Sequence, residues 1–381
     1  MSDLSLQFQQ AASQLPVSSY FDRALYEREL ELIFERGPRY LGHELTIPEV
    51  GDYHALPHEG EGRALLRTPQ GIDVISNVCR HRQAVMLRGR GSVHATPSSG
   101  GNIVCPLHRW TYSAGASAPA GTLLGAPHFA SDPCLDLQKY PVQNWNGLLF
   151  EGNGCDVGRA LAKLGPKKDL DFSGYVYDRT ELHEVDYNWK TFIEVYLEDY
   201  HVGPFHPGLG NFVTCDDLRW EFGREYSVQT VGVAGALGKA GSDVYRRWHD
   251  AVLRYQEGRP PRNGAVWLTL YPNVMVEWYP QVLVVSTLFP RGPQKTLNVV
   301  EFFYPEEIQA FEREFVEAQQ AAYMETCVED DEIALRMDAG RRALMERGEN
   351  QVGPYQSPME DGMQHFHEWY REVMGRHVPT R

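Results

Sequence analysis

The sequence has few cysteines and no long apolar run. Its six cysteines are spread over 381 residues, which is too sparse for the disulfide framework of a small secreted domain and fits metal ligation in a reducing cytoplasm. No stretch approaches the roughly 18 uninterrupted apolar residues of a transmembrane helix. The N-terminus is polar and mixed from Met1 to Asp22, so it predicts no secretory signal.

Positive charge is also scarce. Lys and Arg total 36 against 51 Asp and Glu, which gives a formal net charge of −15. Phosphate backbones are bound through clustered Lys and Arg side chains, and anionic membrane surfaces attract basic segments. The sequence therefore predicts a cytoplasmic protein with no nucleic-acid partner and no membrane partner.

Local patterns divide the chain into three parts and predict an α+β protein. Residues 1–40 show helical spacing of apolar side chains, and we expect this N-terminal segment to pack on the domain formed by residues 156–381. Residues 41–155 alternate short β-like runs with Gly- and Pro-rich turns, which predicts a small antiparallel β-domain. Residues 156–381 combine strand candidates with a long helical stretch expected from about Pro305 to Arg347.

Two short motifs in the β-rich part bring cysteine and histidine together. Cys79 and His81 form a C-x-H pair, and Cys105 and His108 form a C-x-x-H pair; each pair follows a β-like run. Two Cys and two His suit either a tetrahedral zinc site or a [2Fe–2S] cluster with two Cys on one iron and two His on the other. Zinc fingers keep like ligands together, whereas here each loop gives one of each. The interleaving favours the cluster, with buried core residues as a third interpretation.

A second group of ligand types lies between Asn188 and Gly210. Apolar residues recur there at helical spacing, and Gly203-Pro204 is expected to end the helix. His201 would lie on the last turn, His206 in the bend beyond, and Glu198 one turn before His201 on the same face. Two histidines at a helix end have a simple structural interpretation through the helix dipole. With a carboxylate they also make a facial triad for non-heme iron.

The carboxylate of such a triad is expected on the long C-terminal helix. Asp330 shares its helix face with apolar side chains, and a buried carboxylate there needs a partner such as a metal. Glu329 shares its face with charged residues and is expected on a solvated surface, while Asp331 is intermediate. Asp330 is therefore the preferred ligand and Asp331 the second choice.

The chain contains the segments "CRHRQAVMLRGRG" and "CPLHRWTYSAG", followed by E-x-x-H-x₄-H-P. This pattern resembles the Rieske-type non-heme iron aromatic-ring-hydroxylating oxygenases, specifically their α (terminal oxygenase) subunit. The resemblance implies that a Rieske [2Fe–2S] cluster and a mononuclear Fe(II) are bound. The implied cluster ligands are Cys79, His81, Cys105 and His108, the implied iron ligands are His201, His206 and Asp330, and Glu198 is implied to bridge the two centres. One departure is a longer gap between the Rieske motifs, where residues 91–102 predict a polar loop and His94 is expected to be exposed.

The family resemblance also implies a helix-grip catalytic domain, a homotrimer, and O₂ and a small-molecule substrate as reactants. The sequence has no plant-type ferredoxin motif, so a separate NAD(P)H-dependent reductase or ferredoxin is expected. An aromatic substrate that is hydroxylated, dihydroxylated or demethylated is favoured. Glu198 in an E-x-Y-H setting is similar to members that oxidise quaternary ammonium compounds, which gives a betaine- or carnitine-like alternative. A Rieske electron-transfer protein is the non-enzymatic alternative.

Three aromatic residues are candidates to line a substrate pocket: Trp278, Tyr279 and Tyr323. Core packing is the favoured interpretation for each. An aromatic cage around a quaternary ammonium group is the alternative, because ring faces attract cations.

Overall fold

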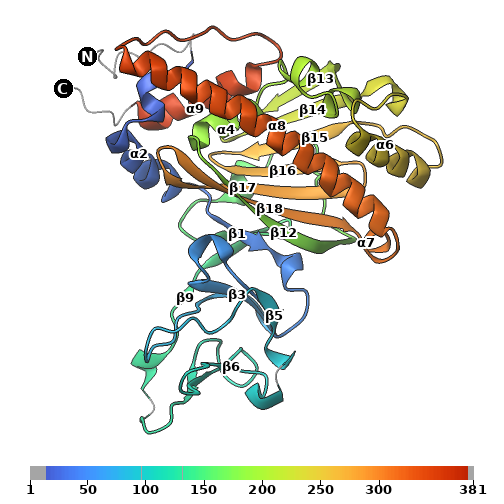
Figure 1. Cartoon of the computed structure of the whole chain (residues 1–381). Helices are drawn as coiled ribbons and strands as arrows, with labels where there is room; N and C mark the ends of the chain where they lie inside the picture. The colour runs from blue at the N-terminus through green and yellow to red at the C-terminus, as the bar shows by residue number, and fades with distance from the viewer. Residues whose placement is uncertain (1–13, 96, 131, 376–381) are drawn as a thin grey trace. The chain divides into compact units, whose positions relative to one another are not determined.

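A computed structural model describes residues 14–95, 97–130 and 132–375, and it divides the chain into two compact units. One unit comprises residues 38–155, and the other combines the chain before residue 38 with the chain after residue 155 (Figure 1). The mixture of helices and antiparallel sheets confirms the predicted α+β class. Within the described ranges, none of the helices combines the length and hydropathy that crossing a bilayer requires.

The smaller unit is built from three antiparallel sheets. The middle strand of its largest sheet is buried on both faces: Ala64 and Leu66 pack in one hydrophobic cluster and Leu65 in another. That sheet has the order β5-β2-β3-β4-β9. The strands are β1 Tyr40–His43, β2 Asp52–Ala55, β3 Arg63–Thr68, β4 Gly71–Ser76, β5 Arg90–Ser92, β6 Ile103–Val104, β7 Thr111–Tyr112, β8 Leu123–Gly125, β9 Lys139–Tyr140, β10 Val142–Trp145 and β11 Leu148–Glu151.

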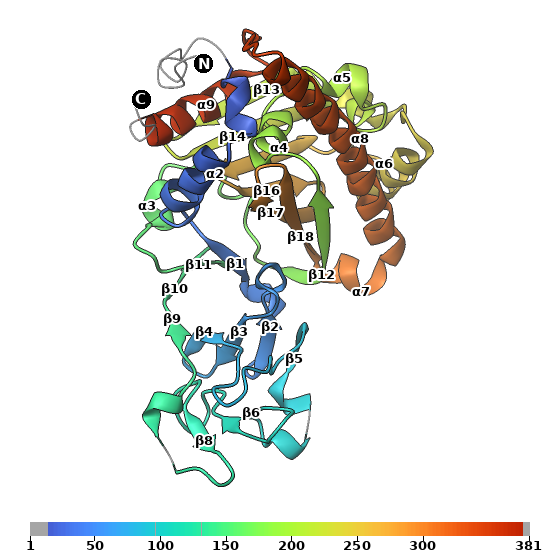
Figure 2. The same cartoon turned by 60° about the vertical axis from the view of Figure 1, so that its left-hand side comes forward.

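The larger unit contains a seven-stranded antiparallel sheet of order β12-β18-β17-β16-β15-β14-β13. Helix α8 crosses one face of this sheet, which is the helix-grip arrangement expected (Figures 1 and 2). The elements are β12 Tyr175–Val185, α4 Trp189–Tyr196, α5 Val202–Phe205, β13 Val213–Phe222, β14 Tyr226–Val233, α6 Asp243–Tyr255, β15 Ala265–Leu270, β16 Val274–Tyr279, β17 Val282–Gly292, β18 Lys295–Pro305, α7 Glu306–Phe311, α8 Arg313–Glu346 and α9 Asp361–Met374.

The predicted long helical stretch is present, but it is interrupted at Glu312 and forms two helices, α7 and α8. The backbone of Glu312 is not helical, with φ −118° and ψ 54°, and it separates α7 from α8. The change of direction lets Ile308 on α7 and Phe315 on α8 enter the same hydrophobic core. Burying both apolar side chains outweighs the helical hydrogen bonds lost at one residue.

The N-terminal segment belongs structurally to the larger unit. Helix α2 Arg23–Glu29 begins at Asp22, whose side chain accepts a hydrogen bond from Leu25 N, and a π-helical turn over Leu30–Phe34 follows. The buried Glu29 accepts hydrogen bonds from Lys190 Nζ at 2.6 Å and Trp189 Nε1 at 2.9 Å on α4. Figure 2 shows α2 near α9. Residues 1–13 of the predicted segment lie outside the described ranges.

Candidate metal centres

The two Cys–His loops of the smaller unit have the same backbone geometry. Cys79 N donates to the carbonyl of Ala84 and Cys105 N to that of Trp110, five residues on in each case. The residue four positions after each cysteine, Gln83 or Arg109, donates back to the cysteine carbonyl and has a positive φ. Two equivalent loops that each present one thiol and one imidazole suit a centre with two metal sites.

The like side chains of the two loops lie together. The Cys79 and Cys105 side chains are buried, and the rings of His81 and His108 lie 4.6 Å apart, centre to centre. His81 stacks on Trp110 at 5.0 Å, and its Nδ1 is buried without a hydrogen-bond partner among the described residues. Two thiols and two imidazoles, one of them with a buried nitrogen that lacks a hydrogen-bond partner, are the donor set of a Rieske cluster. His94 is exposed, as expected.

Tyr112 contacts this site through its hydroxyl group. Its hydroxyl accepts a hydrogen bond from Arg80 N at 3.1 Å and lies 3.6 Å from Cys79 Sγ. Since its oxygen is already used as an acceptor, the hydroxyl proton can point to the sulfur. Hydrogen bonds to cysteine sulfur tune the potential of an iron–sulfur cluster.

The first iron-ligand candidate does not lie on the helix predicted for it. Helix α4 ends at Tyr196, and His201 precedes the short helix α5, which contains Gly203-Pro204. The cause is Glu198, whose carboxylate accepts hydrogen bonds from Tyr200 N at 2.6 Å and His201 N at 3.1 Å. Such side-chain bonds to the backbone offer it an alternative to the helix. The resulting turn points His201 inward.

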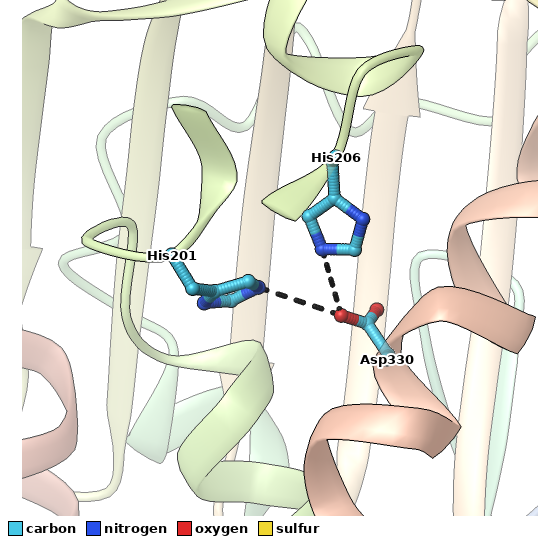
Figure 3. Close-up of side chains that lie close together, drawn as sticks. All are labelled: His201, His206 and Asp330. Carbon is cyan, nitrogen blue, oxygen red and sulfur yellow. Dashed lines mark ion pairs between the residues drawn. The ribbon is translucent and has the colours of Figure 1, made fainter. Parts of the chain in front are cut away.

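His201, His206 and Asp330 converge from two elements (Figure 3). Their ligand atoms all lie within 4.8 Å of one another. Asp330 Oδ1 is 3.0 Å from His206 Nε2 and 3.4 Å from His201 Nε2. Two ligands bound at ~2.1 Å and at right angles to one metal lie ~3 Å apart. His206 Nε2 and Asp330 Oδ1 are buried without a hydrogen-bond partner in the described chain, so the trio fits a facial iron site.

Each histidine has a carboxylate behind it. His201 Nδ1 pairs with Glu198 Oε1, and His206 Nδ1 lies 2.7 Å from Glu329 Oε2. An ionised carboxylate only accepts hydrogen bonds, so each Nδ1 carries the proton and leaves Nε2 free to ligate. Glu329 was expected on a solvated surface, and that expectation is wrong. Asp331, the second-choice ligand, instead bonds Tyr187 Oη at 2.7 Å and His183 Nε2 at 2.9 Å.

The electrostatics of the trio favour a bound cation. Burial alone would lower the pKa of His201, but contacts with Asp330 and Glu198 outweigh it and raise the value to about 10. Burial alone would raise the pKa of Asp330, yet the two imidazoles hold it below its usual range. The Asp330 carboxylate therefore keeps its negative charge and stabilises positive charge at this point, which a divalent iron supplies.

A cavity in the larger unit opens onto the trio. Among the described residues, its lining includes four carboxylates and no Lys or Arg; the carboxylates are Glu198, Asp199, Glu277 and Asp330. Its aromatic lining includes Tyr196, Trp248, Trp267, Tyr279 and Tyr323. Two of the three aromatics considered from the sequence thus line it; Trp278 does not, because neighbouring residues of a strand point to opposite faces.

One unit carries the paired Cys–His loops, and the other carries the site of two histidines and one carboxylate. Together these are the two metal centres of a terminal oxygenase. Family models agree: the Rieske [2Fe-2S] domain matches residues 40–141, and the ring hydroxylating alpha subunit (catalytic domain) matches residues 172–376. The chain belongs to the ring-hydroxylating oxygenase α-subunit family. It is a Rieske non-heme iron oxygenase with a [2Fe–2S] cluster and a mononuclear iron as cofactors.

Individual proteins similar to this chain add detail to the family match. A putrescine 2-hydroxylase of Ralstonia nicotianae is 66% identical, covering 98% of this chain and all of that protein. A putrescine 2-hydroxylase of Bordetella bronchiseptica is 60% identical over 96% of this chain and 85% of that protein. The crystal structure of the quaternary ammonium Rieske monooxygenase CntA with an inhibitor has a TM-score of 0.75 at 19% identity, covering 97% of this chain and 98% of that one. It shows the shared fold.

These findings confirm the predicted family, fold class, enzyme class and both cofactors. The family requires O₂, a substrate and a separate electron donor. The aromatic substrate and the homotrimer are not confirmed.

Proposed function

We propose that this chain is the terminal oxygenase that hydroxylates a carbon of a short aliphatic diamine, with putrescine as its substrate. One atom of O₂ enters a C–H bond and the other leaves as water, with two electrons from a separate reductase and two protons. In this proposal Cys79, His81, Cys105 and His108 hold the cluster. The mononuclear iron, held by His201, His206 and Asp330, supplies the site at which O₂ is activated.

The observation that carries this proposal is the charge of the cavity. Asp199 and Glu277 are 2% and 1% exposed, and they line the cavity with the iron site. Among the described residues, neither forms an ion pair with a Lys or Arg. Both carboxylate oxygens of Asp199 also lack a hydrogen-bond partner there. Buried carboxylates are costly unless a partner compensates them. A diamine brings two ammonium groups to this cavity.

The other substrate classes fit this cavity less well. An aromatic hydrocarbon would leave both buried carboxylates uncompensated. A betaine or carnitine carries a carboxylate of its own, and the described residues that line the cavity include no Lys or Arg to receive it. The two putrescine 2-hydroxylases that resemble this chain support the diamine independently.

The test is turnover by the purified holoenzyme with a surrogate reductase. We expect putrescine to gain one oxygen atom, detected by mass spectrometry, with label from ¹⁸O₂. Naphthalene and carnitine should give no such product. Oxygenation of either one in preference to putrescine would contradict the proposal.

A further inference from the structure

Glu277 lies in the middle of strand β16 and faces helix α8. It occupies one row across the sheet with Gln229 on β14 and Trp267 on β15. Because adjacent strands are ~4.8 Å apart, Gln229 and Glu277 stand about 10 Å apart across the sheet. All three residues line the cavity that holds the iron site.

Two phenols orient the Glu277 carboxylate. Tyr279 Oη donates to Oε2 at 2.8 Å, and Tyr323 Oη on α8 donates to Oε1 at 3.0 Å. An ionised carboxylate offers about four acceptor sites, and a phenol that donates its single proton retains acceptor capacity on oxygen. The remaining hydrogen-bonding capacity of the cluster therefore accepts and does not donate. Its natural ligand is a group rich in N–H donors.

Among the described residues that line the cavity around Glu277, none is a Lys or Arg. Burial is the main cause that raises the pKa of Glu277 to about 7; the two phenols oppose the rise, and the charge of Asp330 adds to it. An incoming cation would relieve the cost of this buried charge, since an opposite charge nearby favours the ionised form.

Aromatic rings enclose the same point. The Tyr279 ring lies 5.8 Å from that of Trp248, 6.1 Å from Trp267 and 6.4 Å from Tyr323, centre to centre, and each pair is edge to face. Such rings pack against a methylene chain and attract a cation through their faces. The surroundings thus suit a charged head on an apolar chain.

From this geometry we infer that Glu277, with the Tyr279 and Tyr323 hydroxyls, is the anchor for one ammonium group of the substrate. The inference rests on the proposed diamine function and adds the residue that selects the charge. By fixing one end of the chain, the anchor determines which carbon faces the iron, so Glu277 is a specificity-determining residue.

The experiment measures putrescine binding to the oxidised holoenzyme without reductase, by isothermal titration calorimetry, so that no turnover occurs. Glu277→Gln keeps the shape and removes the charge, and we expect its Kd to rise at least about tenfold, because a hydrogen bond to a charged group is the stronger kind. Glu277→Asp should recover part of the affinity. The matched control is Glu301→Gln: Glu301 is also buried, on β18, but pairs with Val285 and so faces the opposite side of the sheet. Its Kd should equal that of the wild type.

The outcomes separate the two proposals. If the wild type binds putrescine and Glu277→Gln binds it within about twofold, the anchor is overturned while the diamine function stands. If the wild type neither binds nor oxygenates putrescine, the proposed function itself fails. Should Glu277→Gln lose its cluster spectrum or fold, Tyr323→Phe replaces it. That variant removes one donor and one acceptor of the cluster and should raise the Kd about threefold or more; an unchanged Kd would overturn the anchor.

Discussion

Three consecutive acids on helix α8 have three different partners. Asp330 faces the two imidazoles of the iron site, Asp331 bonds Tyr187, and Glu329 supports His206. The apolar character of its helix face favours Asp330 in the sequence, and Asp330 remains the proposed ligand. The same argument misplaced Glu329, because it considers only neighbours on one helix. The partner of Glu329 comes from a loop 123 residues earlier.

These contacts lead to a test of the ligand assignment. Asp330→Ala should remove the mononuclear iron, because it deletes the one ligand atom that both histidines approach. The visible spectrum of the [2Fe–2S] cluster should stay intact, since its four ligands lie in the other unit. Metal analysis would show the loss of one iron per chain. Asp331→Ala is the matched control and should keep that iron; the reverse pattern would refute the assignment.

At the scale of elements, periodicity located the helices but not their ends. The apolar spacing extends past Tyr196, yet Glu198 captures two backbone N–H groups and ends α4. The spacing also continues through Glu312, where tertiary packing bends the chain into α7 and α8. Both ends depend on contacts that helical periodicity does not encode.

The attachment of the N-terminal segment can be measured. Lys190 on α4 is fully buried, and its ion pair is with Glu29 of α2. Glu29→Ala would leave that ammonium in an apolar interior, which typically costs ~3 kcal/mol or more. We expect a lower urea midpoint in tryptophan fluorescence. Glu27→Ala, which removes the partner of Arg23 in an exposed pair, should leave the midpoint nearly unchanged. Equal effects of the two substitutions would contradict a role of Glu29 as the anchor of this segment.

For the whole molecule, the sequence motifs predicted both metal centres but not the cavity between sheet and helix. Glu277, Trp248 and Trp267 belong to no motif, and their approach depends on strand order and on the path of α8. Glu277 does have one sequence signal, since it is an acid inside the apolar run "VMVEWY" of β16. A buried charge in a central strand predicts a partner, and the diamine is the partner that we propose.

The path of electrons to the iron concerns the free acceptor position of Glu198. Glu198 uses three acceptor positions for His201 Nδ1, His201 N and Tyr200 N. A carboxylate has about four, and the Glu198 side chain is 15% exposed, so one position can accept an N–H from a further imidazole. His108 is exposed in its own unit. We propose that His108 of a neighbouring subunit fills this position in a homotrimer whose heterologous contacts close into a ring.

Hybrid assemblies test this proposal directly. Cys79→Ala should abolish the cluster and Asp330→Ala the mononuclear iron, so each variant alone should be inactive. If electrons cross between subunits, co-expressing the two places the intact cluster of one chain beside the intact iron of its neighbour, and activity should partly return. Mixing the separately purified variants without subunit exchange is the control and should remain inactive. If electrons stay within a subunit, no hybrid joins an intact cluster to an intact iron, so co-expressed assemblies without activity would refute transfer between subunits.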